Sequence, residues 1–185
     1  MSNPTMAVSR TPIARPDPSE HAPYYGKYIA LVPGDDIMRA LETQGRETAQ
    51  LLAGLNESQA AHRYAPDKWS VKEVIGHVTD SERIFCYRAL RIARGDQTPI
   101  EGFEQDDYVR AAQFDRLSIA DLAAEFTVVR RATLRLFASL SPDAWTRRGI
   151  ANNNEVSVRA LAYMIAGHEL HHRRGLREKY GVGQD

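Results

Sequence analysis

The sequence has little of three features that would assign it to particular classes of protein. Cys86 is its one cysteine, which excludes an internal disulfide and a cysteine-based zinc ribbon and favours a small core or interface residue. Lys plus Arg equals Asp plus Glu at 24 each, without the basic excess that nucleic-acid binding usually leaves. The longest apolar run near the start, Ile29 to Val32, is too short for a signal peptide or a membrane span. We therefore expect a cytoplasmic protein that binds neither nucleic acid nor membrane.

Length and proline distribution indicate one globular domain behind an N-terminal extension. A chain of 185 residues that is 43% hydrophobic suffices for one domain with a real core. Residues 1–33 are rich in proline and have few apolar side chains before Tyr24, so we expect a partly flexible extension whose residues 1–20 form a tail. Side chains from Tyr24 to Leu31 are expected to hold the extension against the domain, which spans residues 34–182. Exposed aromatics near Tyr24 to Tyr28 would also suit a homodimer.

Four stretches carry apolar residues at helical spacing. The second opens with a capping box, in which Ser70 and Glu73 satisfy each other's end of the first turn, and it stops at Gly95. No stretch alternates between apolar and polar residues for long enough to predict a strand. The fold class is therefore all-α, with helices expected over residues 35–55, 70–95, 118–141 and 157–180.

The connection between the second and third of these helices is unusually long. It runs from Gly95 to Leu117, whereas helices of a bundle are usually joined by a few residues. Each helix is roughly 35 Å long at about 1.5 Å per residue, and an extended connection of this length can cross that distance. This predicts an up-down-down-up four-helix bundle, although a long functional loop between antiparallel helices also fits. Residues 102–108 mix acids with aromatics, which fits a short surface helix or a wall over a binding site.

The last helix carries two histidines in the middle of its buried face. Imidazoles one helical turn apart bind one metal ion well, because a neutral ring nitrogen from each reaches the same point. The alternative is a pair of hydrogen-bonded core histidines, which needs two sets of buried partners. The apolar stripe, in steps of three and four residues, comprises Val158, Leu161, Ile165, His168, His172 and Leu176.

A third histidine favours the metal site. His77 lies about seven residues from the start of the second helix, and His172 lies about eight residues from the end of the fourth. These helices are antiparallel in an up-down-down-up bundle, so the three rings reach the same depth. We expect His77, His168 and His172 to bind one divalent metal ion and to leave a fourth position open, as in catalytic sites. Glu169, about 50° from the histidine stripe, is a candidate hydrogen-bond partner or proton acceptor, with a solvated surface charge as the alternative.

Two segments resemble the DinB family of damage-inducible bundle proteins. One runs from Lys68 to His77 and continues to Asp80 and Glu82, and the other comprises residues 156–161 and 166–172. The resemblance spans roughly residues 35–180 and implies the same bundle topology, with a zinc or nickel ion on His77, His168 and His172. Relatives include transferases that use low-molecular-weight thiols such as bacillithiol, a mycothiol-dependent isomerase, and members described as metal-dependent hydrolases; dimers are common. The N-terminal extension departs from the family pattern, which leaves the substrate open.

We therefore expect a metal-dependent enzyme that acts on a small molecule, either by hydrolysis or by transfer of a low-molecular-weight thiol. A non-catalytic metal-binding or sensor protein is one alternative. A zinc peptidase is another, because His168 to His172 reads H-E-x-x-H; Glu169 would then be the general base and Glu178 the third ligand. Against it, thirteen residues follow His172, no upstream strand is expected to hold a peptide, and His77 would have no role. The sequence does not identify substrate-binding residues.

Overall fold

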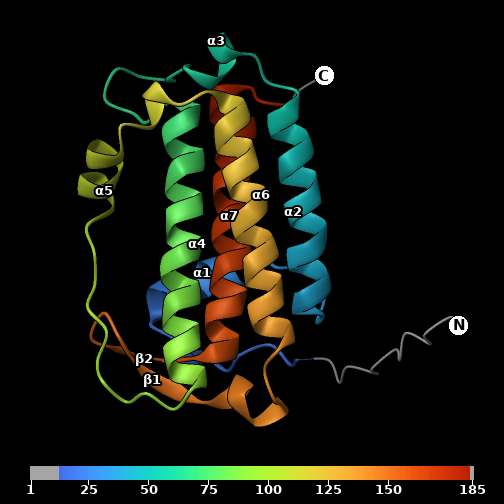
Figure 1. Ribbon diagram of the computed structural model, residues 1–185, viewed down its shortest axis with the longest axis vertical. Helices are drawn as coiled ribbons and strands as arrows, with labels where there is room; N and C mark the ends of the chain where they lie inside the picture. The colour runs from blue at the N-terminus through green and yellow to red at the C-terminus, as the bar shows by residue number, and fades with distance from the viewer. Residues whose placement is uncertain (1–12, 184–185) are drawn as a thin grey trace, which may run out of the picture.

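Four long helices pack side by side in the computed structural model, which describes residues 13–183 (Figure 1). They are α2 (Ile37–Ala53), α4 (Val71–Ala93), α6 (Ile119–Ala138) and α7 (Val158–Tyr180). The shorter helices are α1 (Gly26–Ile29), α3 (Glu57–Ala60) and α5 (Gln105–Ala112), with 3-10 turns at Pro18–Glu20, Pro23–Tyr25, Phe114–Arg116 and Pro142–Thr146. The prediction of an all-α four-helix bundle is confirmed. Among the described residues, no helix is both long and apolar enough to cross a bilayer.

The long helices follow the up-down-down-up order that the long connection predicted. In Figure 1, α2 and α7 run in one direction, whereas α4 and α6 run in the other. Each of α4 and α2 contacts both α6 and α7, so the four helices form a closed ring around the core. The chain returns from the end of α4 to the start of α6 along the outside of the bundle, and α5 packs against α4 on the way (Figure 1). The alternative of antiparallel second and third helices is wrong.

Polar caps fix where the helices begin. The Ser70 hydroxyl accepts a hydrogen bond from the backbone N–H of Glu73, whose carboxylate accepts one from the Ser70 N–H at 2.8 Å. This is the predicted capping box. Ser118 and Ser157 cap α6 and α7 through their hydroxyls, and Gly181 ends α7 with a φ of 69°. Because side chains follow the helix at fixed steps, these caps set the depth and direction of every residue that α4 and α7 present to each other.

The core is densest around the first half of α7. With the exception of Arg159, residues 158–167 are all buried. α4 and α2 cover two sides of α7, and α1 packs on a third. A helix that is covered on several sides needs apolar or small residues all round, which explains why this half of α7 has no polar face.

Two short strands precede α7, and the expectation that the chain has no strand was wrong. β1 (Arg148–Ala151) pairs with β2 (Asn154–Ser157) in an antiparallel hairpin. The two residues of its turn, Asn152 and Asn153, have φ values of 49° and 60°, a conformation that asparagine tolerates better than most residues. Each strand has only four residues, so alternation of apolar and polar side chains is too brief to recognise.

The described part of the N-terminal extension packs against the bundle. Residues 1–12 of the expected flexible tail lie outside the described residues, but residues 13–20 differ from that expectation. Arg15 donates to the carbonyl oxygens of Ile29 and Val32 at 2.7 and 2.8 Å, and the carboxylate of Glu20 pairs with Arg159 of α7. These contacts hold α1 in place on α7.

Close packing fixes where α1 rests on α7. The backbone of Tyr28 lies so near Gly167 that a Cβ there would overlap the Tyr28 carbonyl oxygen. The approach brings the Tyr28 ring within 5.6 Å of the His168 ring and 5.0 Å of the His171 ring, measured between centroids. Tyr28 was among the aromatic residues expected to suit a dimer interface. It is only 6% exposed and therefore belongs to the interior.

Candidate metal centre

Three histidines from two helices meet where α4 and α7 face each other. His77 comes from α4, and His168 and His172 come from α7. The Nε2 atom of His168 lies 3.2 Å from Nε2 of His77 and 3.0 Å from Nε2 of His172. One ring nitrogen of each residue lies within 4.8 Å of the other two. The structure thus brings together all three residues that helical spacing and matched depth had singled out.

Aromatic side chains surround the three imidazoles. The centroid of the Trp69 ring lies 4.8 Å from that of His77, and the Tyr28 and Phe85 rings stand perpendicular to the His168 ring at centroid distances of 5.6 and 6.1 Å. These rings exclude water from one side of the cluster and restrict the motion of the imidazoles. His77 itself is only 4% exposed. The cluster is therefore preorganised and largely dry, as a metal site in a bundle requires.

Burial keeps the three imidazoles neutral. It lowers the pKa of His77 to about 4, against a small opposing effect of the Asp106 carboxylate. Burial, together with the neighbouring imidazoles, lowers the pKa of His172 to about 3 and that of His168 well below its ordinary value. A neutral imidazole has a lone pair on one ring nitrogen, which is the form that binds a metal ion.

The geometry of the nitrogens fits a cation better than a hydrogen-bonded cluster. A neutral ring nitrogen either donates one hydrogen or accepts through one lone pair, so Nε2 of His168 cannot make full hydrogen bonds to both of its Nε2 neighbours. A shared cation removes this conflict, because all three lone pairs can point at it. Nitrogens about 2.0–2.1 Å from a tetrahedral zinc ion stand roughly 3.3 Å apart, close to the spacing found here. The residues present therefore fit a divalent metal ion.

The lowered pKa values predict metal binding that survives mild acidification. Three imidazoles with the ordinary pKa of about 6.5 would each be about nine-tenths protonated at about pH 5.5, which would weaken binding about a thousandfold. A lowered pKa leaves the neutral form populated as the pH falls, until the pH approaches about 4. We expect the affinity for Zn²⁺ to change less than about tenfold between about pH 7.5 and 5.5. Competition with a chromophoric chelator measures it, and a thousandfold loss would contradict the buried, neutral cluster.

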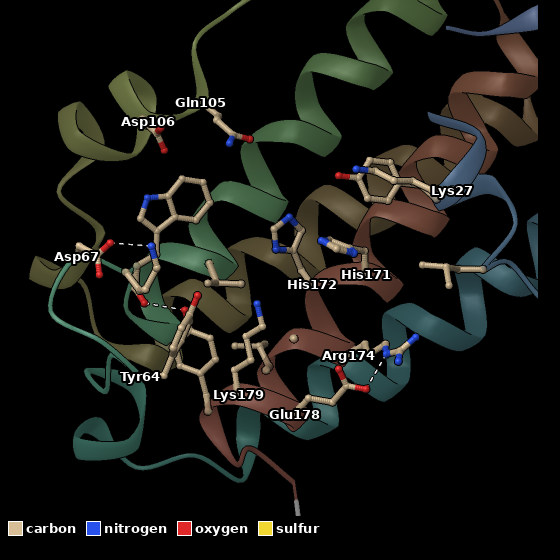
Figure 2. Close-up of a pocket in the computed structure, with 18 residues that line it drawn as sticks. Lys27, Tyr64, Asp67, Gln105, Asp106, His171, His172, Arg174, Glu178 and Lys179 are labelled. Carbon is tan, nitrogen blue, oxygen red and sulfur yellow. Dashed lines mark hydrogen bonds and ion pairs between the residues drawn. The ribbon is translucent and has the colours of Figure 1, made fainter. Parts of the chain in front are cut away.

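A cavity of about 700 Å³ opens directly onto this cluster (Figure 2). His172 lines it, and Figure 2 shows its ring in the centre of the cavity wall, next to His171. α1 supplies one side through Lys27 and Tyr28, and α5 supplies another through Gln105 and Asp106. Both interpretations of residues 102–108 apply, since they include the start of the short helix α5, whose first turn forms part of the cavity wall.

The two acids of the peptidase alternative do not join the cluster. Glu169 is 2% exposed, and its carboxylate accepts hydrogen bonds from Thr48 at 2.5 Å and from Arg130 at 2.7 Å. It does not line the cavity, and no contact with a histidine ring is found among the described residues. Glu178 pairs instead with Arg174 at 2.6 Å. His77 takes the third position that the peptidase pattern would give to Glu178.

Sequence reasoning missed a buried ionic network beside the cluster. Arg130 of α6 donates to both carboxylate oxygens of Glu82 at 2.9 and 2.7 Å and to Glu169 at 2.7 Å. Thr133 donates to Glu82, as Thr48 does to Glu169. One feature of the sequence could have indicated this network, namely a charged residue on the buried face of α6. Arg130 lies there, four residues after Phe126 and seven before Phe137.

The sequence profile of the DinB superfamily matches residues 40–175, which is most of the chain. This range contains all three histidines of the cluster. No curated protein sequence matches the chain.

Solved structures share the fold at low sequence identity. YfiT from Bacillus subtilis, described as a probable metal-dependent hydrolase with an unusual four-helix bundle topology, has a TM-score of 0.70 at 15% identity over 91% of each chain. A mycothiol-dependent maleylpyruvate isomerase has a TM-score of 0.66 at 13% identity, over 84% of this chain and 63% of the isomerase. With the profile match and the topology in agreement, the chain belongs to the DinB superfamily.

Proposed function

We propose that the protein is a metal-dependent enzyme that binds one divalent ion, Zn²⁺ or Ni²⁺, through His77, His168 and His172. The observation that carries this proposal is the convergence of three neutral ring nitrogens at the wall of a cavity. No further His, Cys, Asp or Glu joins the group among residues 13–183. Three protein ligands leave a position for water or a substrate atom, whereas a structural site is closed by a fourth protein ligand. This favours an enzyme over a non-catalytic metal-binding protein.

The size and walls of the cavity support a small-molecule substrate. A volume of about 700 Å³ lies within the range of roughly 300–1,000 Å³ that is usual for ligand pockets. Trp69, Tyr64 and Tyr180 line it and offer flat apolar surfaces to a ligand. The hairpin of β1 and β2 lies at the opposite end of the bundle from α3 (Figure 1), and none of its residues lines the cavity. Within residues 13–183, no strand edge is therefore available at the cavity to bind a peptide in extended form.

The bound ion would lower the pKa of a water molecule or thiol at its free position. Two reactions fit, hydrolysis by activated water and transfer of a low-molecular-weight thiol that serves as co-substrate. The similar structures include a protein described as a hydrolase and a thiol-dependent isomerase, which supports both. The chain's own residues hold the three nitrogens neutral and limit access of water from the Trp69 and Phe85 side.

We assign Glu169 a positioning role in place of the expected proton acceptor. Its carboxylate is tied to Thr48 of α2 and Arg130 of α6, so it fixes the rotation of α7 about its axis. The adjacent His168 and the next-turn His172 depend on that rotation to face His77. The Glu169→Gln variant should therefore bind metal more weakly. The pH dependence of any turnover should stay unchanged, because the carboxylate transfers no proton.

A panel of substrates tests the proposed function. Metal-loaded protein, metal-free protein and a loaded His62→Ala control, whose exposed histidine does not line the cavity, are incubated with activated esters and amides, and separately with electrophiles plus bacillithiol, mycothiol or glutathione. We expect turnover of one class that requires the ion and persists in His62→Ala. Stoichiometric metal binding without turnover in either class, even at high protein concentration, would favour a sensor or structural role.

A further inference from the structure

The cavity holds two positive charges without an acidic partner. Of its four cations, Lys68 pairs with Asp67 at 2.7 Å and Arg174 pairs with Glu178 at 2.6 Å. The other two, Lys27 and Lys179, form no ion pair with any described residue. The remaining acid of the cavity, Asp106, likewise has no ion pair among the described residues.

Aromatic rings hold both free ammonium groups at the cavity. The Lys27 Nζ atom lies 3.9 Å from the centre of the Tyr24 ring and 5.0 Å from that of Tyr28. The Lys179 Nζ atom lies 5.4 Å from the centre of the Tyr64 ring. Cation–π contacts of this kind attract the ammonium group but leave its N–H donors free. Both lysines are therefore preorganised and still able to bind an anion.

The free charges of opposite sign lie on different walls. Lys27 belongs to α1 and Lys179 to the last turn of α7, while Asp106 belongs to the first turn of α5. In Figure 2, Asp106 lies across the cavity from Lys27, with His172 between them. An anionic group would be attracted to the wall of α1 and α7 and repelled from that of α5. The charges thus favour one orientation of an acidic ligand.

We propose that the cavity binds small acids, whose carboxylate or comparable anionic group is attracted by the charges of Lys27 and Lys179 while another part of the same molecule reaches the three histidines. Only one part of this inference, that the ligand reaches the three histidines, rests on the proposed function. Lys27 lies near the histidine cluster, because the centroid of the Tyr28 ring is 5.0 Å from the Lys27 Nζ atom and 5.6 Å from the centroid of the His168 ring. A compound of a few carbon atoms can therefore span the two points.

Nuclear magnetic resonance of the lysine side chains tests the anion site without any metal. The lysines of the chain are Lys27, Lys68, Lys72 and Lys179, so ¹³Cε-labelled lysine gives a simple spectrum. Titration with 3-mercaptopropionate should shift the Lys27 and Lys179 signals to saturation, and 2-mercaptoethanol, its uncharged counterpart, should not. Lys72 is buried and paired with Glu57, so its signal serves as an internal reference. Equal responses to both compounds, or none, would overturn the proposal.

Cobalt-loaded protein tests the orientation toward the metal centre. Binding of either thiol to Co²⁺ changes the visible absorption, and we expect the acid to bind about fivefold or more tightly than the uncharged thiol at low ionic strength. The double variant Lys27→Met/Lys179→Met should lose this preference. Arg46→Met, which removes the same charge from a residue that does not line this cavity, should retain it. A preference that survives in the double variant would overturn the proposal.

The two measurements separate failure of this inference from failure of the proposed function. Absence of Co²⁺ binding with intact lysine responses would refute the metal centre but support the anion site. Binding of Co²⁺ and of both thiols with equal affinity would refute the anion site and leave the metal centre standing.

Discussion

His77→Ala is expected to lower the affinity for Zn²⁺ and Ni²⁺ by more than about 100-fold. Loss of a direct ligand lowers metal affinity more than the roughly 10–100-fold that is typical when a residue that only supports a ligand is replaced. The remaining pair, His168 and His172, can still bind an ion, but with two protein ligands in place of three. The purified wild-type protein should contain one ion per chain, and the variant should contain almost none. Elemental analysis and chelator competition measure both quantities.

A neighbouring histidine provides the matched control. His171 precedes His172, is exposed, and does not belong to the cluster of three. His171→Ala should therefore keep its ion. The helix content of both variants, followed by circular dichroism, should equal that of the wild type. Retention of metal by His77→Ala would show that the two histidines of α7 form the site with other ligands, as the peptidase pattern requires.

Arg130→Met is expected to lower the free energy of unfolding by about 3–5 kcal/mol, the cost of breaking a buried ion pair by removing one partner. Glu82 and Glu169 are each 2% exposed, and Arg130 is the cation that both contact. Without it, two carboxylates remain in the interior near each other and away from water. Urea unfolding followed by circular dichroism measures the loss. The loss corresponds to a fall in melting temperature of about 10 °C for a domain of this size.

Two further variants separate the charge effect from simple disruption of packing. Arg131→Met changes the next residue of α6, which is exposed, and should alter stability by less than about 0.5 kcal/mol. Replacing Glu82→Gln and Glu169→Gln in the Arg130→Met background removes the uncompensated charges and should recover much of the lost stability. If the triple variant is no more stable than Arg130→Met, lost packing rather than unpaired charge accounts for the effect.

The bundle and its histidines could be predicted because both depend on local rules. Helical spacing placed His168 and His172 on one buried face, and the capping box at Ser70 fixed the depth of His77 in its helix. The length of the connection to α6 then favoured parallel second and third helices, although a long loop between antiparallel helices also fitted. Each of these steps uses residues that lie close together in the sequence.

The features that were missed depend on contacts between distant segments. The partners of Arg130 lie 48 and 39 residues away, at Glu82 and Glu169, and nothing local indicates their distance or direction. The same holds for Tyr28, which reaches the cluster only because Gly167 lets α1 approach the backbone of α7. For this reason we propose a positioning role for Glu169 in place of the expected one. The sequence placed Glu169 near the histidine stripe of α7 but did not indicate Thr48 and Arg130, which occupy its carboxylate.

Two walls of the cavity, α1 and α5, lie outside the four long helices, whereas the histidines lie within them. The histidines reside on two helices whose packing carries the stability of the bundle, while two short peripheral segments carry Lys27, Tyr28, Gln105 and Asp106. Changes at the exposed positions Lys27, Gln105 and Asp106 would alter which compounds are accepted and need not repack the interior, whereas Tyr28 is buried against α7. A scaffold divided in this way can change the compounds that its cavity accepts, during evolution or by design in the laboratory, while the three histidines stay the same.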